Sequence, residues 1–192
     1  LQAYALEIQE AVDKNLQATD EVAESWTAYK RAQKAQTTTT VVNALITTSW
    51  SHSPCYNHLC PADPSLSYHG GHPTTGCVAT AMSQIMKYWE YPTMGTGNHI
   101  YRSRHYGTLS ANYANTTYDW ANMPLKLSSA STSTQINAVA TLMYHCGVSV
   151  DMDYNSDGRG SSGSQIIEYY GGEASSEYAL KKYFGYASTV TS

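Results

Sequence analysis

The stretch TTGCVATAMSQIMKYW, residues 74–89, decides how this chain folds. Its apolar side chains recur at helical spacing, at Val78, Met82, Ile85, Met86 and Trp89. Thr74 or Thr75 can cap the start of such a helix, and Pro92 ends it soon after residue 89. The pattern therefore predicts an amphipathic helix that packs against a core along this stripe, with Cys77 in its first turn.

Cys77 has the position that a nucleophile needs. A thiol attacks only as the thiolate, and the backbone N–H groups at a helix N-terminus stabilise that negative charge. Gly76 leaves room for an incoming carbonyl group. The N–H of Cys77 has no acceptor within a helix that starts here, so it can point into an oxyanion hole. From spacing alone, a buried structural cysteine at a helix start remains the alternative.

The composition argues against several classes of partner. The 192 residues carry 15 acidic and 11 basic side chains, a formal net charge of −4, which speaks against a broad phosphate-binding face and hence against nucleic acid. The sequence holds no apolar run near the roughly 18 residues of a membrane span. Only 14% of the residues are charged, and this neutral polar surface suggests a secreted protein.

No metal ion or cofactor is expected. The 7 histidines and 4 cysteines show no zinc spacing of the CxxC or HExxH kind. Four aspartates do not match a Ca²⁺ loop: Asp63, Asp151, Asp153 and Asp157. Cys55 and Cys60 are close enough in sequence to pair, although a secreted disulfide framework would have more cysteines than this in a chain of this length.

The rest of the chain contains both helices and strands. Residues 1–34 are predicted to be helical, with a second helical stretch over 21–33, and residues 34–40 to form an extended connector. This connector is either a domain boundary or a surface loop within one domain. The later elements are expected in this order: a loop-rich segment at 41–73, the Cys77 helix, a surface meander at 95–130, a helix over 133–146 capped by Gly147, a strand over 148–154, a Gly/Ser loop at 155–164 and a helix over 175–183. Because helices and strands are segregated rather than alternating, the chain fits the α+β class.

The residues from Thr75 to Tyr88 resemble the nucleophile helix of the streptopain family (C10) of papain-like cysteine peptidases. Further stretches agree with the family in order and spacing: Tyr91-Pro92, Tyr118-Asp119-Trp120, residues 148–154 and residues 179–186. The resemblance extends from Val41 to Tyr186. It is closest to the homologues of anaerobic gut and oral Bacteroidetes, in which Asn155-Ser156-Asp157-Gly158 is a familiar continuation.

The resemblance implies a papain-like α+β fold, of which this chain holds the N-terminal part with the Cys helix. Proteins of this family are exported as zymogens, and their prodomain blocks the active site until proteolysis removes it. Residues 1–36 would be the C-terminal part of a prodomain, and residues 37–192 the N-terminal part of the peptidase domain, with maturation near residues 34–40. The expected protein is a secreted or cell-surface bacterial cysteine endopeptidase. Its partners would be peptide or protein substrates and its own inhibitory prodomain.

The catalytic base is expected outside this chain. In the family it is a histidine in a Gly-Gly-His segment well downstream of the cysteine, and no such segment occurs between Cys77 and Ser192. Gly70-Gly71-His72 precedes the cysteine and is interpreted as a loop, and His145 as a packed helix residue. A thiol–imidazole pair therefore requires the remaining half of the catalytic domain, and this fragment alone is expected to be inactive.

Three further residues are implied in the site by the resemblance. The family places a glutamine upstream of the cysteine, where it donates an amide N–H to the oxyanion, and His52 stands at that place. A histidine can donate one N–H, so the oxyanion hole can survive, although an exposed loop residue is the alternative interpretation. Gly160 and Ser161 lie in the stretch that lines the substrate cleft of the family. Their backbone groups would pair with an extended peptide, unless the stretch is a flexible surface loop.

Two other functions are compatible with these residues. A catalytically impaired family member that acts as a surface binding or adhesion domain is suggested by His52 in the place of the glutamine and by the missing base. A thiol acyltransferase or amidase would use the same nucleophile but pass the acyl group to an added amine. Turnover that vanishes in Cys77→Ala would exclude the binding domain.

Overall fold

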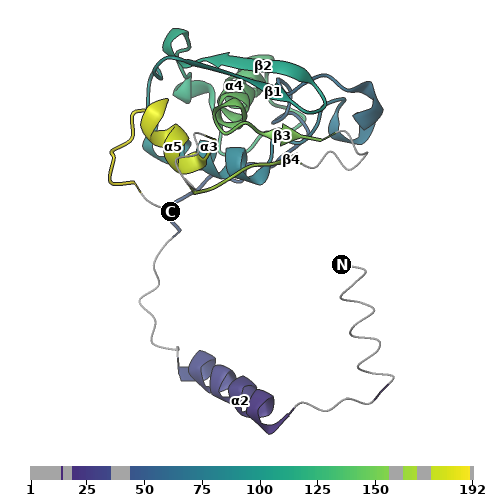
Figure 1. Ribbon diagram of the computed structural model, residues 1–192, viewed down its shortest axis with the longest axis vertical. Coiled ribbons are helices and arrows are strands. Elements are labelled where there is room, and N and C mark those ends of the chain that lie inside the picture. The colour runs from purple at the N-terminus through teal and green to yellow at the C-terminus, as the bar shows by residue number, and fades with distance from the viewer. Residues whose placement is uncertain (1–13, 15–18, 36–43, 156–161, 168–173, 191–192) are drawn as a thin grey trace. The chain divides into compact units, whose positions relative to one another are not determined.

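The computed structural model describes residue 14 and residues 19–35, 44–155, 162–167 and 174–190. The chain divides into two compact units, Leu1–Asn43 and Ala44–Ser192 (Figure 1). The first unit contains helix α2 (Asp20–Ala35), which confirms the second helical stretch and extends it by two residues into the expected connector. The first helical stretch, apart from residue 14, and connector residues 36–40 lie outside the described residues.

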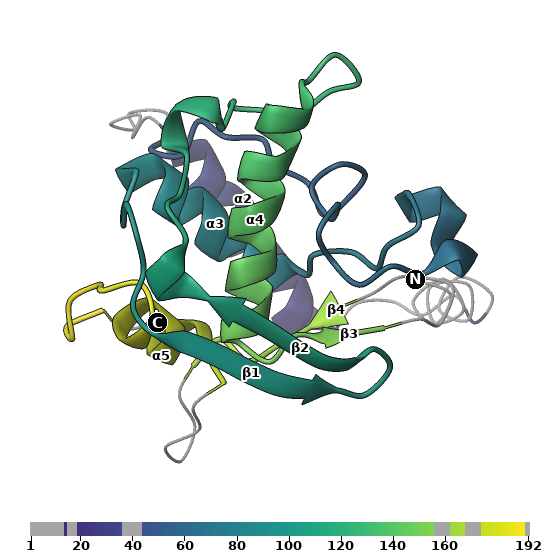
Figure 2. The same cartoon turned by 90° about the horizontal axis from the view of Figure 1, so that it is seen from above.

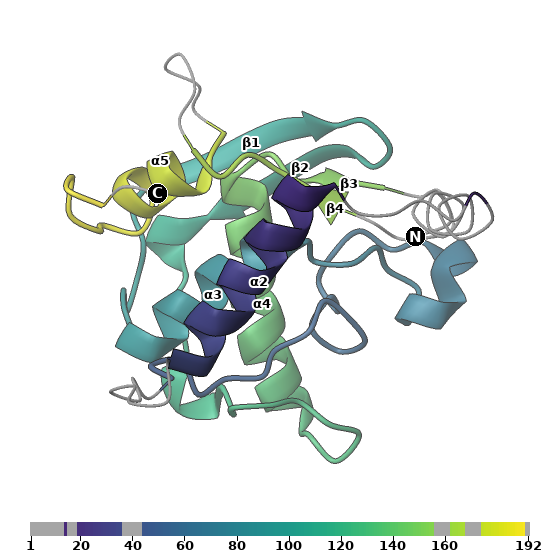
Figure 3. The same ribbon diagram turned by 90° about the horizontal axis from the view of Figure 1, so that it is seen from below.

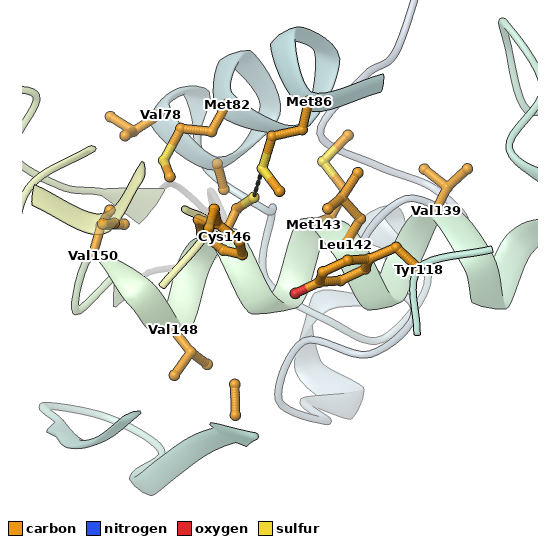
Figure 4. Close-up of a cluster of buried hydrophobic side chains, with 14 of the residues drawn as sticks. Val78, Met82, Met86, Tyr118, Val139, Leu142, Met143, Cys146, Val148 and Val150 are labelled. Atoms are coloured by element: carbon orange, nitrogen blue, oxygen red, sulfur yellow. Dashed lines mark hydrogen bonds between the residues drawn. The ribbon is translucent and has the colours of Figure 1, made fainter. Parts of the chain in front are cut away.

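The core of the second unit forms between helices α3 (Cys77–Trp89) and α4 (Ser133–Ser149). Figure 4 shows the buried side chains that face one another across this interface: Val78, Met82 and Met86 from α3, and Val139, Leu142, Met143 and Cys146 from α4. Removing these apolar groups from water is the main contribution to the stability of this packing. The predicted helix at Cys77 is confirmed. Its apolar stripe is only partly core, however, because Ile85 and Trp89 are 37% and 65% exposed.

The start of α3 differs from the predicted threonine cap. The N-cap residue is Gly76, and no side chain caps the helix. The hydroxyl of Thr75 lies 3.0 Å from the hydroxyl of Thr80, within hydrogen-bond distance. The Thr80 hydroxyl also donates to the Gly76 carbonyl at 2.9 Å. The hydroxyls of Thr75 and Thr80 are therefore satisfied within the loop and the first turn, without capping the helix.

A β-hairpin covers the side of α4 away from α3 (Figure 2). Strands β1 (Asn98–Ser103) and β2 (Gly107–Asn112) pair antiparallel, with Asn98 opposite Asn112 and Ser103 opposite Gly107. The surface meander predicted here is wrong. Only alternate residues of these short strands turn inward, and polar residues such as His99 and Ser103 hold some inward positions, so the apolar alternation is weak.

The segment after the hairpin also enters the core. It contains two short 3₁₀ helices, η2 (Tyr113–Asn115) and η3 (Trp120–Asn122). Five large side chains of this segment are buried: Tyr113, Tyr118, Trp120, Met123 and Leu127. These residues therefore belong to the core and not to the predicted surface meander.

Helix α4 continues past Gly147, so the prediction that this glycine caps the helix is wrong. The glycine is needed for a close contact instead. A Cβ atom at this position would collide with the hydroxyl of Tyr154, so the glycine permits close packing inside the helix. The helix ends at Ser149, and the strand predicted over 148–154 shrinks to β3 (Asp153–Tyr154). The four apolar side chains of this stretch are all buried, namely Val148, Val150, Met152 and Tyr154, and Ser149 between them is buried as well.

Two short elements complete the unit. Strand β4 (Ser162–Gly163) pairs antiparallel with β3, and helix α5 (Ser176–Lys182) follows, which confirms the last predicted helix. Both elements contact α3, and in Figure 3 they lie on opposite sides of the view. The unit is thus of mixed helix and sheet, as the α+β prediction requires. Within the described ranges, no helix has the length and apolar character needed to cross a bilayer.

Candidate active site

Cys77 is the exposed cysteine of the chain, and the other three are less accessible. Cys55 is half-buried, whereas Cys60 and Cys146 are buried. Burial raises the pKa of the Cys60 thiol to about 12 and that of the Cys146 thiol to about 12, so both are protonated at neutral pH. All four thiols are free, so the possible pairing of Cys55 with Cys60 is not observed. The thiol that can meet a substrate is therefore the one at the start of α3.

Gly76 allows the backbone to deliver Cys77 to the surface. Its φ of +85° lies in a region that favours glycine. A Cβ atom there would lie 2.6 Å from Sδ of Met152 and 3.3 Å from Cβ of Ser162. The hydroxyl of Ser162 donates to the carbonyl of Thr74 at 2.6 Å. The loop before the nucleophile is therefore packed directly against the β3–β4 pair, with no room for a side chain.

A second segment, residues 48–57, lies against the nucleophile loop and helix. The backbone N–H of Thr75 donates to the carbonyl of His52 at 3.2 Å. The buried side chain of Asn57 donates from Nδ2 to three carbonyls, those of His69, His72 and Pro73, at 2.9, 3.1 and 3.1 Å. The structure thus brings the backbone of His52 beside the loop of Cys77, with the His52 side chain half-buried.

The other histidines considered from the sequence have structural contacts. His72 donates from Nδ1 to the carbonyl of Cys60 at 2.8 Å, in the loop that follows the short helix η1 (Pro64–His69). His145 is 8% exposed inside the α4 core, where burial lowers its pKa to about 4. Neither ring is therefore placed as a base for Cys77. The predicted cleft residues Gly160 and Ser161 lie outside the described residues.

An apolar groove of about 540 Å³ opens beside Cys77. It lies between the outer face of α3 and the chain around α5, and its lining includes Cys77, Ile85, Trp89, Ile166, Leu180 and Val190. This explains the exposure of Ile85 and Trp89, which face the groove rather than the core. A second cavity of about 570 Å³ lies along the β3–β4 pair and is lined by Asp151, Asp153 and Ser162, among others.

Sequence reasoning missed the residues that hold the site together. Asn57, Gln84 and Met152 act through hydrogen bonds or contacts with residues far away in sequence, and no local spacing indicates such partners. Gln84 lies off the apolar stripe of α3, on nearly the same face as Cys77, so nothing in the helical pattern indicated a structural role for it. Among the described residues, no cluster of three or more His, Cys, Asp or Glu side chains has the arrangement of a metal site.

Comparison with known proteins places this arrangement among the papain-like cysteine peptidases. The chain belongs to the peptidase C10 family, which matches residues 50–192. Streptopain of Streptococcus pyogenes is 35% identical over 147 residues, which cover 70% of this chain and 34% of streptopain. The thiol protease/hemagglutinin PrtT of Porphyromonas gingivalis is 34% identical over 115 residues, 58% of this chain and 13% of that protein.

Two solved structures from Prevotella intermedia share the fold. Active wild-type interpain A, a cysteine protease, aligns with a TM-score of 0.64 and 38% identity over 75% of this chain and 55% of its own. A prointerpain A fragment aligns with a TM-score of 0.63 and 31% identity over 88% of this chain and 57% of its own. These values confirm the papain-like fold and the resemblance to a Bacteroidetes-type C10 peptidase. The chain spans about a third of the length of streptopain and little more than half of each solved relative.

Proposed function

We propose that this chain is the nucleophile-bearing part of a secreted cysteine endopeptidase that is made as a zymogen. The observation that carries the proposal is the exposure of Cys77 at the N-terminus of α3, next to an apolar groove, while Cys60 and Cys146 are buried. A helix N-terminus stabilises a thiolate, and an exposed thiolate can reach a peptide carbonyl. The membership in the C10 family supports a peptidase over other uses of such a thiolate.

In this mechanism, Sγ of Cys77 bonds to the scissile carbonyl carbon, and the C=O electron pair moves to the oxygen. The N–H of Cys77 and the side chain of His52 would hold this oxyanion. Collapse of the intermediate breaks the C–N bond and leaves a thioester, while a protonated histidine from sequence beyond this chain gives its proton to the leaving amine. Water then adds to the thioester with the same histidine as base, and the C–S bond breaks to release the acid and the thiolate.

The half of the domain that brings this histidine would cover the apolar groove. Trp89 is 65% exposed and Ile85 is 37% exposed on the wall of the groove, and apolar side chains of this size gain free energy when they are covered. Cys77 is one of the residues that line the groove, and the base would have to arrive beside it. Gly160 and Ser161 would line the substrate cleft and pair with the substrate backbone.

The first unit would contain the end of the inhibitory prodomain, with residues 1–36 removed on maturation by a cut near residues 34–40. The prointerpain A fragment matches 88% of this chain and active interpain A matches 75%, which supports a pro-segment at one end of the chain. Release of this segment would convert the inactive precursor into the active peptidase.

The test uses the full-length protein and a thiol-directed peptidyl epoxide. We expect one adduct, mapped to Cys77, and hydrolysis of a fluorogenic peptide that requires reductant and disappears in Cys77→Ala. Cys55→Ser, which alters the half-buried thiol, is the matched control and should keep its turnover. An adduct on Cys55 or Cys146 with Cys77 unmodified would contradict the proposed nucleophile.

A second candidate, a surface binding or adhesion domain without catalysis, is favoured by the histidine at position 52. It predicts no turnover in the reduced full-length protein and no effect of Cys77→Ala on binding.

A further inference from the structure

The nucleophile helix contacts the segment of His52 through one polar side chain. Gln84 lies seven residues after Cys77, two helical turns along α3 and on nearly the same face. Its Oε1 atom accepts a hydrogen bond from the backbone N–H of Trp50 at 3.2 Å and another from the Thr48 hydroxyl at 3.0 Å. The segment that leads into His52 is therefore attached to the same helix that carries the thiol.

The attachment at Trp50 is reinforced from the other side. The indole Nε1 of Trp50 donates to the carbonyl of Pro124 at 2.8 Å, and the side chain is 7% exposed. Two residues further on, the carbonyl of His52 accepts the hydrogen bond from Thr75. The backbone between residues 50 and 52 is thus held at both ends, and at each end the partner belongs to the helix or the loop of Cys77.

We propose that Gln84 is a positioning residue for the oxyanion side of the active site, which sets the place of His52 relative to Cys77. The inference rests on the proposed function. An oxyanion donor works only when it lies within about 2.7–3.1 Å of the developing charge. A displacement of about 1 Å can cost on the order of 10² in rate. In this role Gln84 acts through the segment that its Oε1 holds, by the bonds from Trp50 and Thr48, and not by a bond to the substrate.

The test compares two variants in the full-length protein. Gln84→Met keeps the size and apolar stem of the side chain but removes the acceptor, whereas Gln84→Glu keeps an oxygen that can accept both bonds. We expect kcat of Gln84→Met to fall by about 10- to 100-fold with KM nearly unchanged, since removal of a hole donor costs about 10²–10³ and a displaced donor costs less. Gln84→Glu should restore most of kcat.

Two measurements separate positioning from a general loss of structure. The rate at which iodoacetamide alkylates Cys77 should stay the same in Gln84→Met, because this reaction needs no oxyanion hole. In a His52→Ala background, Gln84→Met should cause little further loss of kcat, because both changes act through the same donor. Tyr118→Phe, which removes a buried hydrogen bond far from this segment in sequence, is the control and should lower the unfolding temperature without changing kcat.

The outcomes are distinguishable from those of the proposed function. If Cys77→Ala keeps its turnover, the peptidase proposal itself fails. If Cys77→Ala is inactive while Gln84→Met has the wild-type kcat, only the role of Gln84 is overturned. Losses that multiply in the double variant, or a parallel fall in the alkylation rate of Cys77, would also overturn it, since Gln84 would then act on the whole fold.

Should Gln84→Met not fold, Gln84→Asn shortens the side chain by one methylene group and must show the same fall in kcat.

Discussion

The hydroxyl of Tyr118 lies 3.0 Å from Nδ1 of His145, in the core beside α4. His145 is 8% exposed, and its burial lowers the pKa of its ring to about 4, because the charged imidazolium would lose its hydration. An unfolded histidine has a pKa of about 6.5, so the unfolded state binds the proton more readily. The folded state therefore requires a neutral His145 ring, and protonation of this ring favours unfolding.

From this relationship we expect a loss of stability in mild acid. The neutral His145 ring contributes to the free energy of unfolding in full above pH 6.5. This contribution falls as the pH drops from about 6.5 to about 4, and it amounts to about 3 kcal/mol in all. Urea unfolding of the 192-residue chain between pH 7.5 and pH 4 measures it. His145→Asn should flatten this dependence, and His105→Asn, a change at an exposed histidine of the hairpin, should leave it intact. An equal slope in wild type and His145→Asn would contradict the assignment.

Gly76→Ala is expected to be strongly destabilising for two separate reasons. The φ of +85° is strained for alanine, and the new Cβ would lie 2.6 Å from Sδ of the buried Met152. Together these effects should cost about 3 kcal/mol or more in the free energy of unfolding.

Gly71→Ala is the matched control for this change. Its φ is +81°, but nothing lies within 4 Å of the added Cβ, so only the backbone strain applies, about 1–2 kcal/mol. Denaturant unfolding of both variants isolates the packing against Met152. Equal losses would mean that Met152 moves aside and that the close approach is unimportant.

The four thiols are expected to react with iodoacetamide in a fixed order. Cys77 should be alkylated first at pH 7.5, and the half-buried Cys55 more slowly. Cys60 and Cys146 should stay unmodified until the chain unfolds, because they are buried and each has a pKa of about 12. Peptide mapping by mass spectrometry gives the order, and alkylation of Cys146 at the rate of Cys77 in the folded protein would refute it.

Asn57→Asp should unfold the loop that leads to the nucleophile. The amide group donates to three carbonyls within 3.1 Å at a position that is 1% exposed, whereas a carboxylate would place its oxygens against them. We expect a loss of about 3 kcal/mol or more, with easier proteolysis of residues 58–75. Asn112→Asp is the control: the oxygen of this exposed side chain accepts from the N–H of Asn115, and aspartate keeps that bond. Similar losses in both variants would contradict the special role of Asn57.

Prediction from the sequence succeeded where the information is local. The helices of Cys77, of residues 133–146 and of residues 175–183 all follow from apolar periodicity and caps, and the structure confirms them within a few residues. The hairpin at 98–112 was missed because its inward residues are partly polar. Gly147 was misassigned as a cap because a glycine in sequence does not reveal whether it serves a turn or a close contact.

For the site, the sequence by itself determined that a cysteine follows a glycine at the start of an amphipathic helix, because helical periodicity and capping depend on neighbouring residues only. The tertiary structure decided which thiol is exposed and what holds the facing segment. The hydrogen bonds of Gln84 join it to residues 34 and 36 positions away, and those of Asn57 join it to residues 12 to 16 positions away. These partners, and the exposure of each thiol, are set only when the tertiary structure has formed. Burial is a property of that packing, so the spacing along the chain left open whether Cys77 is an exposed nucleophile or a buried structural cysteine.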